Sequence, residues 1–199
     1  LIMYGDATDS NNTKRDTVQG ILDLAGGGWA YVSAVTASTS PTIAFTNQAS
    51  GYDYEYVFES IIPVTDDVEL RAEVGVAGPT YRTSGYQTSR TYISRDGTSV
   101  GVGSINGTIA HFALAIGIGN TATEGINRFV VMLSDPANSG NYTQLNAQGT
   151  IEDTGGDVNN VMAGEKYHTT AEANTAIKFY FSSGNIASGT VTQYRRSLS

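Results

Sequence analysis

Apolar and polar residues alternate with a period of two along most of the chain after residue 28. The pattern is clearest in YDYEYVFES, residues 52–60, where aromatic residues alternate with acidic ones over most of the segment. Successive side chains of a β-strand point to opposite faces of the sheet, so this spacing predicts a strand with one buried and one solvated face. The segment 68–74, VELRAEV, repeats the pattern after a short turn at Pro63. We therefore expect the two segments to form an antiparallel hairpin.

The alternation in 68–74 assigns apolar residues to the interior and charged residues to solvent. The two sets are, in that order, Val68, Leu70, Ala72 and Val74, and Glu69, Arg71 and Glu73. Across the predicted hairpin, Arg71 is expected to pair with Glu59 or Glu55, and such a cross-strand pair contributes about 0.2–1 kcal/mol.

Short strand patterns recur along the rest of the chain and are separated by turns rich in Gly, Asp, Asn and Ser. The further predicted strands are 29–36, 42–46, 88–94, 108–116, 128–134, 142–151, 175–181 and 190–194. Regularly spaced strands without a second helical segment are typical of an all-β fold. We predict a jelly-roll-like antiparallel β-sandwich over residues 29–199.

The chain ends in two alternating runs joined by a Ser/Gly/Asn stretch. In the first run, Ile177, Phe179 and Phe181 occupy alternate positions and are expected to face the interior. Gly184-Asn185 is suited to a tight turn. We expect a terminal hairpin whose last strand closes the sheet, so that truncation after Gly184 abolishes folding.

Residues 1–28 carry the one helical pattern of the sequence. The apolar residues are spaced at i, i+3, i+4 and i+7 and form a single stripe, which consists of Val18, Ile21, Leu22 and Ala25. Thr13 and Asp16 resemble a capping box, and Gly26 to Gly28 suit the helix end. A helix of about ten residues is too short to be stable alone in water. We predict a linker and short amphipathic helix that serves attachment or trimerisation.

Composition narrows the range of partners. The 199 residues carry a net charge of −8 with a pI near 4.6, and the 11 basic residues are spread thinly, so we expect no nucleic-acid partner. No apolar run approaches the ~18 residues of a membrane span, and we expect neither membrane insertion nor a signal peptide. The chain has no cysteine, which excludes disulfides and thiolate metal sites. The start at Leu1 suggests a fragment or a processed chain.

Catalytic patterns are weak. The two histidines, His111 and His168, stand in no catalytic frame, and we expect His111 to be a strand or edge residue with a satisfied ring. The acidic residues of 52–60 share one strand face, which fits a solvated face better than a glycosidase pair. The glycine-rich segments 101–107 and 117–120 complete no phosphate-binding motif and are expected to be turns. We expect no enzyme activity, no cofactor and no metal.

The segment 78–92, GPTYRTSGYQTSRTY, is the most promising candidate for recognition. Its aromatic and basic residues lie in a polar stretch between predicted strands, and they are Tyr81, Arg82, Tyr86, Arg90 and Tyr92. Tyr and Arg in loops are favoured anchors of surface recognition, and an aromatic ring beside hydroxyls suits a sugar. The alternative is that Tyr81 and Tyr86 cover the edge of the sandwich.

Three pieces of the chain resemble the β-rich C-terminal domain of tail-fibre and fibre-like virion proteins of tailed bacteriophages. Residues 4–29 resemble the T-K-K-x-T-V junction before such domains, and 54–86 is similar to a Y-x-F…L-x-P-x-T-D…L-R pattern. The matching positions of the latter are Pro63, Thr65, Asp66, Leu70, Arg71, Gly78, Tyr81, Ser84 and Tyr86. The segment 177–194 resembles the terminal I-x-F-x-F-x-S-G-N-x-x-S-G-T, although Gln193 and Arg195 replace the usual apolar residue and Gly.

The resemblance implies a homotrimeric virion protein that is displayed on a tail or capsid and engaged in attachment. We expect its ligand to be a host-surface glycan. Its motifs are structural and supply no catalytic residue. Two alternatives stay open: a capsid decoration protein without a receptor, and a glycan depolymerase. A decoration protein would need a footing on the capsid, which the N-terminal segment could supply, and an enzyme would need two facing carboxylates in a groove.

Overall fold

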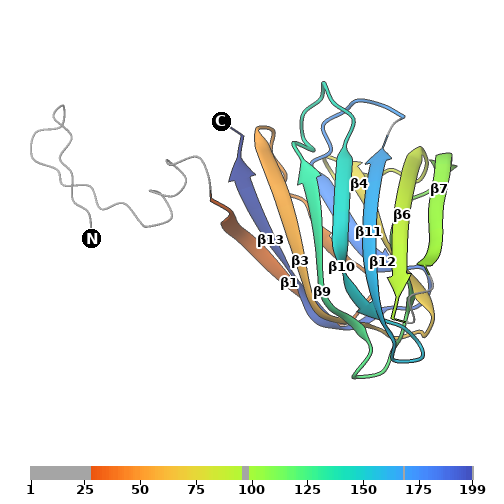
Figure 1. Cartoon of the computed structure of the whole chain (residues 1–199). Helices are drawn as coiled ribbons and strands as arrows, with labels where there is room; N and C mark the ends of the chain where they lie inside the picture. Colours follow the sequence, from red (N-terminus) through yellow and green to blue (C-terminus); the bar gives the residue numbers. More distant parts are fainter. Residues whose placement is uncertain (1–27, 96–98, 168, 199) are drawn as a thin grey trace, which may run out of the picture.

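The computed structural model describes residues 28–95, 99–167 and 169–198, and this part of the chain consists of strands and turns. Two antiparallel sheets pack face to face, with the eight-stranded sheet toward the viewer in Figure 1 and β4 and β12 behind it. This confirms the predicted all-β antiparallel sandwich. The predicted helix and its stripe, Val18, Ile21, Leu22 and Ala25, lie outside the described residues.

The larger sheet has eight strands, of which β1 and β7 form the two edges. The strands in spatial order are β1 (Ala30–Ser40), β13 (Ile186–Ser197), β3 (Tyr52–Pro63), β9 (Gly125–Ser134), β10 (Gln144–Glu152), β11 (Val158–Tyr167), β6 (Tyr86–Ser94) and β7 (Ser99–Ile109). Every neighbouring pair in this sheet is antiparallel.

The smaller sheet is built around β4, which pairs with β12, β5 and β8. Its strands are β2 (Ile43–Phe45), β12 (Ala176–Phe181), β4 (Val68–Val76), β5 (Thr80–Tyr81) and β8 (Phe112–Ile118). The register of β4 with β8 shifts twice, which bends β8 at the margin of the sheet.

Aromatic side chains form the centre of the core between the two sheets. The ring of Phe179 on β12 lies 5.3 Å from that of Tyr56 and 4.8 Å from that of Phe58, both on β3. These three side chains are buried, as the alternation predicted, and so are Leu70 and Val74 on β4. Edge-to-face pairs at such distances add about 0.5–1.5 kcal/mol each beyond the burial of area.

The predicted hairpin of 52–60 with 68–74 is wrong. These strands, β3 and β4, belong to different sheets, and the chain crosses the sandwich between them. Asp67 has a φ of 54° at this crossing, in the left-handed region. Two strands whose apolar faces meet across the core show the same alternation as two strands side by side. Arg71 consequently pairs with Glu69 rather than with Glu59 or Glu55.

The terminal hairpin is wrong for the same reason. β12 lies in the small sheet and β13 in the large one, although Ile177, Phe179 and Phe181 are buried as predicted. The crossing uses Gly184, with a φ of 69°. β13 does not lie at an edge of its sheet; it lies between β1 and β3 and pairs with both over most of its length.

Two further segments differ from the prediction. Residues 101–107, expected as a turn, belong to strand β7, and the predicted strand 108–116 is broken into β7 and β8, which lie in different sheets. The strand β11 was not predicted. Its inward positions include the buried polar residues Asn159 and Glu165, while Met162 faces out, so the usual pattern of apolar and polar residues is partly reversed.

The turns that carry the resemblance motifs pack on each other at one end of the sandwich. The backbone N–H of Val64 donates to the carbonyl of Asn185 at 2.9 Å. A Cβ on Gly184 would lie 2.2 Å from Oγ1 of Thr65. Residues of both motifs therefore form a contact between the segment that crosses from β3 to β4 and the segment that crosses from β12 to β13.

Candidate functional site

Tyr86, one of the five residues predicted to bind a ligand, is a core residue. Its side chain is 0% exposed, its hydroxyl donates to the carbonyl of Arg82 at 2.9 Å, and it accepts from the N–H of Val74 at 3.1 Å. The expectation of a surface contact at Tyr86 is therefore corrected. The hydroxyl satisfies backbone groups that would otherwise be buried without a partner.

Tyr81 and Arg82 lie together at the end of the small sheet. Arg82 forms a two-pronged ion pair with Glu172, with both N···O distances at 2.6 Å. The ammonium of Lys178 lies 4.6 Å from the ring centre of Tyr81. Both side chains are partly exposed, and a ligand-binding role for them stays a prediction.

Arg90 and Tyr92 lie on β6 and share the inward face of that strand with Tyr86. Tyr92 packs against the core, and Arg90 reaches the small sheet, where its Nη1 donates to the carbonyl of Ala113 at 3.2 Å. The five predicted residues therefore do not form one exposed cluster.

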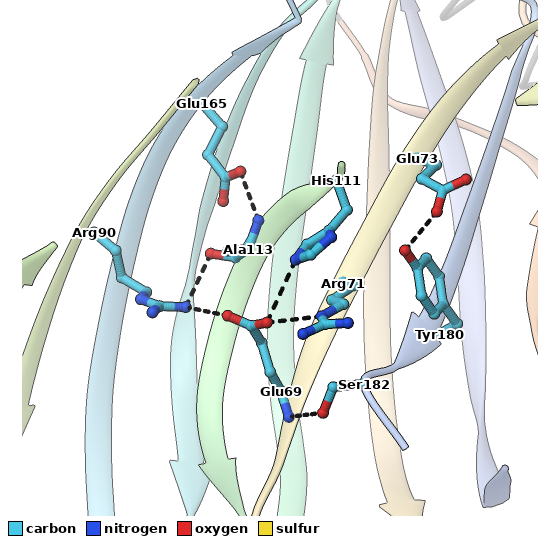
Figure 2. A network of polar contacts seen from close by, with 9 residues as sticks. All are labelled: Glu69, Arg71, Glu73, Arg90, His111, Ala113, Glu165, Tyr180 and Ser182. Atoms are coloured by element: carbon cyan, nitrogen blue, oxygen red, sulfur yellow. Dashed lines mark hydrogen bonds and ion pairs between the residues drawn. The ribbon is translucent and has the colours of Figure 1, made fainter. Parts of the chain in front are cut away.

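A polar network joins the two sheets near β8 (Figure 2). Glu69 is at its centre and accepts from Nε of Arg71 at 2.7 Å and from Nη1 of Arg90 at 3.2 Å. Nε2 of His111 lies 3.5 Å from the same carboxylate. Burial alone would raise the pKa of Glu69, but the hydrogen bonds from His111, Arg71 and Arg90 outweigh it and lower the pKa to about 2.

Glu165 belongs to the same network, but its pKa is shifted in the opposite direction from that of Glu69. Its side chain comes from β11 and is 5% exposed, and its Oε2 accepts from the N–H of Ala113 at 2.8 Å (Figure 2). The other oxygen, Oε1, is buried without a hydrogen-bond partner. Burial raises the pKa of Glu165 to about 8, although the Ala113 bond acts in the other direction.

Two carboxylates with pKa values pushed apart are a pattern found in acid–base catalysis. Here, however, the groups connect the sheets: Glu69 on β4 pairs with Arg90 on β6, and Glu165 on β11 caps the backbone of β8. Apart from Oε1 of Glu165, the carboxylate oxygens of both groups are engaged by other groups of the chain, so the network ties β4, β6, β8 and β11 together.

The acidic turn 153–157, DTGGD, is closed by hydrogen bonds from its own residues and from Asn159. The carboxylate of Asp153 accepts from the N–H groups of Gly155 and Asp157 and from the side chain of Asn159. Across 28–95, 99–167 and 169–198, no cluster of three His, Asp or Glu side chains is placed to hold a metal ion.

The outward face of the large sheet carries a different kind of feature, which we call the outer furrow. It consists of three adjoining hollows, and their volumes are 420, 370 and 190 Å³. The first two share Gln148 and Met162, and the last two share Arg128. The furrow therefore continues across six neighbouring strands, β13, β3, β9, β10, β11 and β6.

Hydroxyl and amide side chains line the two larger hollows together with apolar residues, among them Val130, Met132 and Met162. The two larger hollows are bordered by Ser89, Thr91, Asn146, Gln148, Thr150 and Asn160. Met162, which is 60% exposed, borders both of them. The third hollow lies between the aromatic rings of Trp29 and Tyr194, with Glu55 and Glu59 beside them.

Sequence reasoning missed this site, although part of its signal is visible. In 142–151, Asn146, Gln148 and Thr150 alternate with small or apolar residues, which marks an outward face made of hydroxyl and amide groups. The contribution of β11 could not be found, because that strand itself was not predicted.

The sequence matches no protein-family model, and no curated protein sequence is similar to it. In the part of the chain that the structure describes, no helix is long and apolar enough to cross a membrane.

Proposed function

We propose that the chain is a fibre-type structural protein of a bacteriophage virion, displayed on the tail or the capsid, and that its β-sandwich attaches the particle to the host surface. The outer furrow carries the attachment part of this proposal. It is an exposed, elongated site that combines hydroxyl and amide groups with apolar surface, as the binding of a surface polymer requires.

The sequence motifs support the virion part of the proposal. The motif positions include residues with a structural role. Gly184 packs closely against Thr65, and the buried hydroxyl of Tyr86 donates to the carbonyl of Arg82. Motifs of this kind label a fold family more directly than an activity.

The acidic residues of the furrow favour binding over hydrolysis. Glu55 and Glu59 are the two carboxylates at the third hollow, and both project from the same face of β3, on either side of Val57, instead of facing each other across a groove. A glycosidase pair needs carboxyl groups about 5 Å or about 6.5–9.5 Å apart. A capsid decoration protein without a receptor is the alternative, and its predicted footing lies in residues 1–28.

Immunogold electron microscopy tests the virion assignment. Antibodies raised against residues 28–198 are applied to particles purified from cells that produce this chain. We expect label at tail tips or at regular capsid positions. Label confined to free protein, with bare particles, would contradict a virion location.

The homotrimer also stays a prediction, because the stripe of Val18, Ile21, Leu22 and Ala25 lies outside the described residues. Light scattering on residues 1–199 at micromolar concentration should give three times the chain mass of 21.0 kDa. A mass equal to that of one chain would contradict the trimer.

A further inference from the structure

The length of the outer furrow indicates a polymer rather than a single small molecule. Its lining comes from six neighbouring strands, between Tyr194 on β13 and Ser89 on β6. Neighbouring strands lie about 4.8 Å apart, so the furrow spans about 24 Å across the strands. A ligand that fills it must be an extended chain of several units.

The chemistry of the lining indicates hydroxyl-bearing units. Amide groups of Asn146, Gln148 and Asn160 offer both donors and acceptors, and the hydroxyls of Ser89 and Thr91 do the same. A sugar hydroxyl is itself both a donor and an acceptor and can match either kind of group.

The furrow also offers surfaces for the apolar faces of sugar rings. Met162 is 60% exposed at the junction of the two larger hollows, and Trp29 and Tyr194 border the third. Val130 and Met132 on β9 add further apolar surface to the two larger hollows.

Charge selects among possible glycans. The first hollow has no charged residue, and Arg128 is the one basic residue among those that line the furrow. Glu55 and Glu59 lie at the opposite end from Ser89, and the whole chain carries a net charge of −8. An anionic polymer would be repelled, whereas an uncharged one meets matching donors and acceptors.

The site is rigid before any ligand arrives. β9, β10 and β11 are interior strands, each hydrogen-bonded on both sides, so the lining side chains project from fixed backbone. Binding then requires little ordering of the protein, and weak contacts repeated along a polymer can add up.

We propose that the outer furrow binds an uncharged polysaccharide, which lies across the strands with several consecutive sugar units in contact. This inference rests on the proposed attachment function and specifies its ligand class and its site. The remaining exposed surface is not required for it.

A polysaccharide array tests the proposal. The full chain is applied to immobilised neutral glucans, mannans and galactans, with polygalacturonate as the anionic member. Two variants, Gln148→Ala and Met162→Ala, change side chains at the junction of the larger hollows. Gln144→Ala is the matched control, because Gln144 is an exposed residue of the same strand that borders none of the three hollows.

We expect binding to one or more neutral polysaccharides, a loss of at least about tenfold in both furrow variants, and unchanged binding by Gln144→Ala. Binding that all variants retain would overturn the furrow site but not attachment. Binding to polygalacturonate alone would overturn the ligand class. No binding to any glycan would contradict glycan attachment itself. A changed oligomeric mass of Met162→Ala by light scattering would show that a second copy occupies the furrow, and would also overturn the proposal.

Discussion

Glu165 is an acidic side chain held between two sheets, and its surroundings determine its charge. One oxygen caps the N–H of Ala113, and the other has no partner. An ionised carboxylate with an unpaired buried oxygen is costly, which agrees with the raised pKa of about 8. At neutral pH the group is therefore mostly neutral, whereas Glu69 nearby stays ionised.

The Glu165→Gln variant should change the pH dependence of stability. In the unfolded chain Glu165 titrates near its ordinary pKa of 4.5, so between pH 4.5 and 8 the folded state holds one proton more. The free energy of unfolding of the wild type then falls as pH rises through this window, by up to about 1.4 kcal/mol per pH unit from this group.

Urea unfolding at pH 5, 6, 7 and 8 measures the effect. Glu165→Gln should become more stable relative to the wild type with each step, and the difference should level off above pH 8. The exposed control Gln144→Ala, which changes no titratable group, should run parallel to the wild type. Parallel curves for Glu165→Gln would contradict the raised pKa.

At Gly184, the backbone conformation and the neighbouring atoms disfavour any residue that carries a side chain. Its φ of 69° and the 2.2 Å approach of a Cβ to Thr65 Oγ1 both oppose a side chain. We expect Gly184→Ala to lower the free energy of unfolding by about 1–3 kcal/mol. In Gly164→Ala the new Cβ has its nearest neighbour at 3.9 Å, and the change should stay within about 0.5 kcal/mol. Equal effects in the two variants, measured by urea unfolding, would contradict this account.

At the scale of elements, alternation identified strands well but not their partners. The inward faces of β3, β4 and β12 follow directly from aromatic and aliphatic residues at every second position. β11 escaped because Asn159 and Glu165 face inward, where they hydrogen-bond to Asp153 and Ala113, and because Met162 faces outward. The same reversal hid the part of the furrow lining that β11 supplies, which is Asn160, Met162, Ala163 and Gly164.

Removal of β13 tests whether the large sheet depends on its C-terminal strand. β13 lies between β1 and β3, and both partners lose a full ladder of hydrogen bonds when it is removed. We expect the chain truncated after Gly184 to show no cooperative thermal transition by circular dichroism. The chain truncated after Ser197 loses the bond from Leu198 N–H to the carbonyl of Gly51 but keeps both ladders of β13, and it should melt cooperatively. A soluble, cooperatively melting 1–184 chain would contradict the central role of β13.

At the scale of the molecule, the fold class was predictable and the topology was not. The sandwich follows from regular strand spacing and turn chemistry. Which strands share a sheet depends on crossings such as those at Asp67 and Gly184, and alternation is the same for a crossing and a hairpin. The furrow exists only because six strands from distant parts of the sequence lie side by side (Figure 1).

The central claim is that this assembled face binds an extended uncharged glycan. The most direct test is isothermal titration calorimetry with fragments of increasing length from a neutral polysaccharide that the array identifies. The account predicts that affinity rises with each added sugar unit until the fragment reaches about 24 Å, the width of six strands, and then levels off. A monosaccharide that binds as tightly as the longest fragment would contradict it.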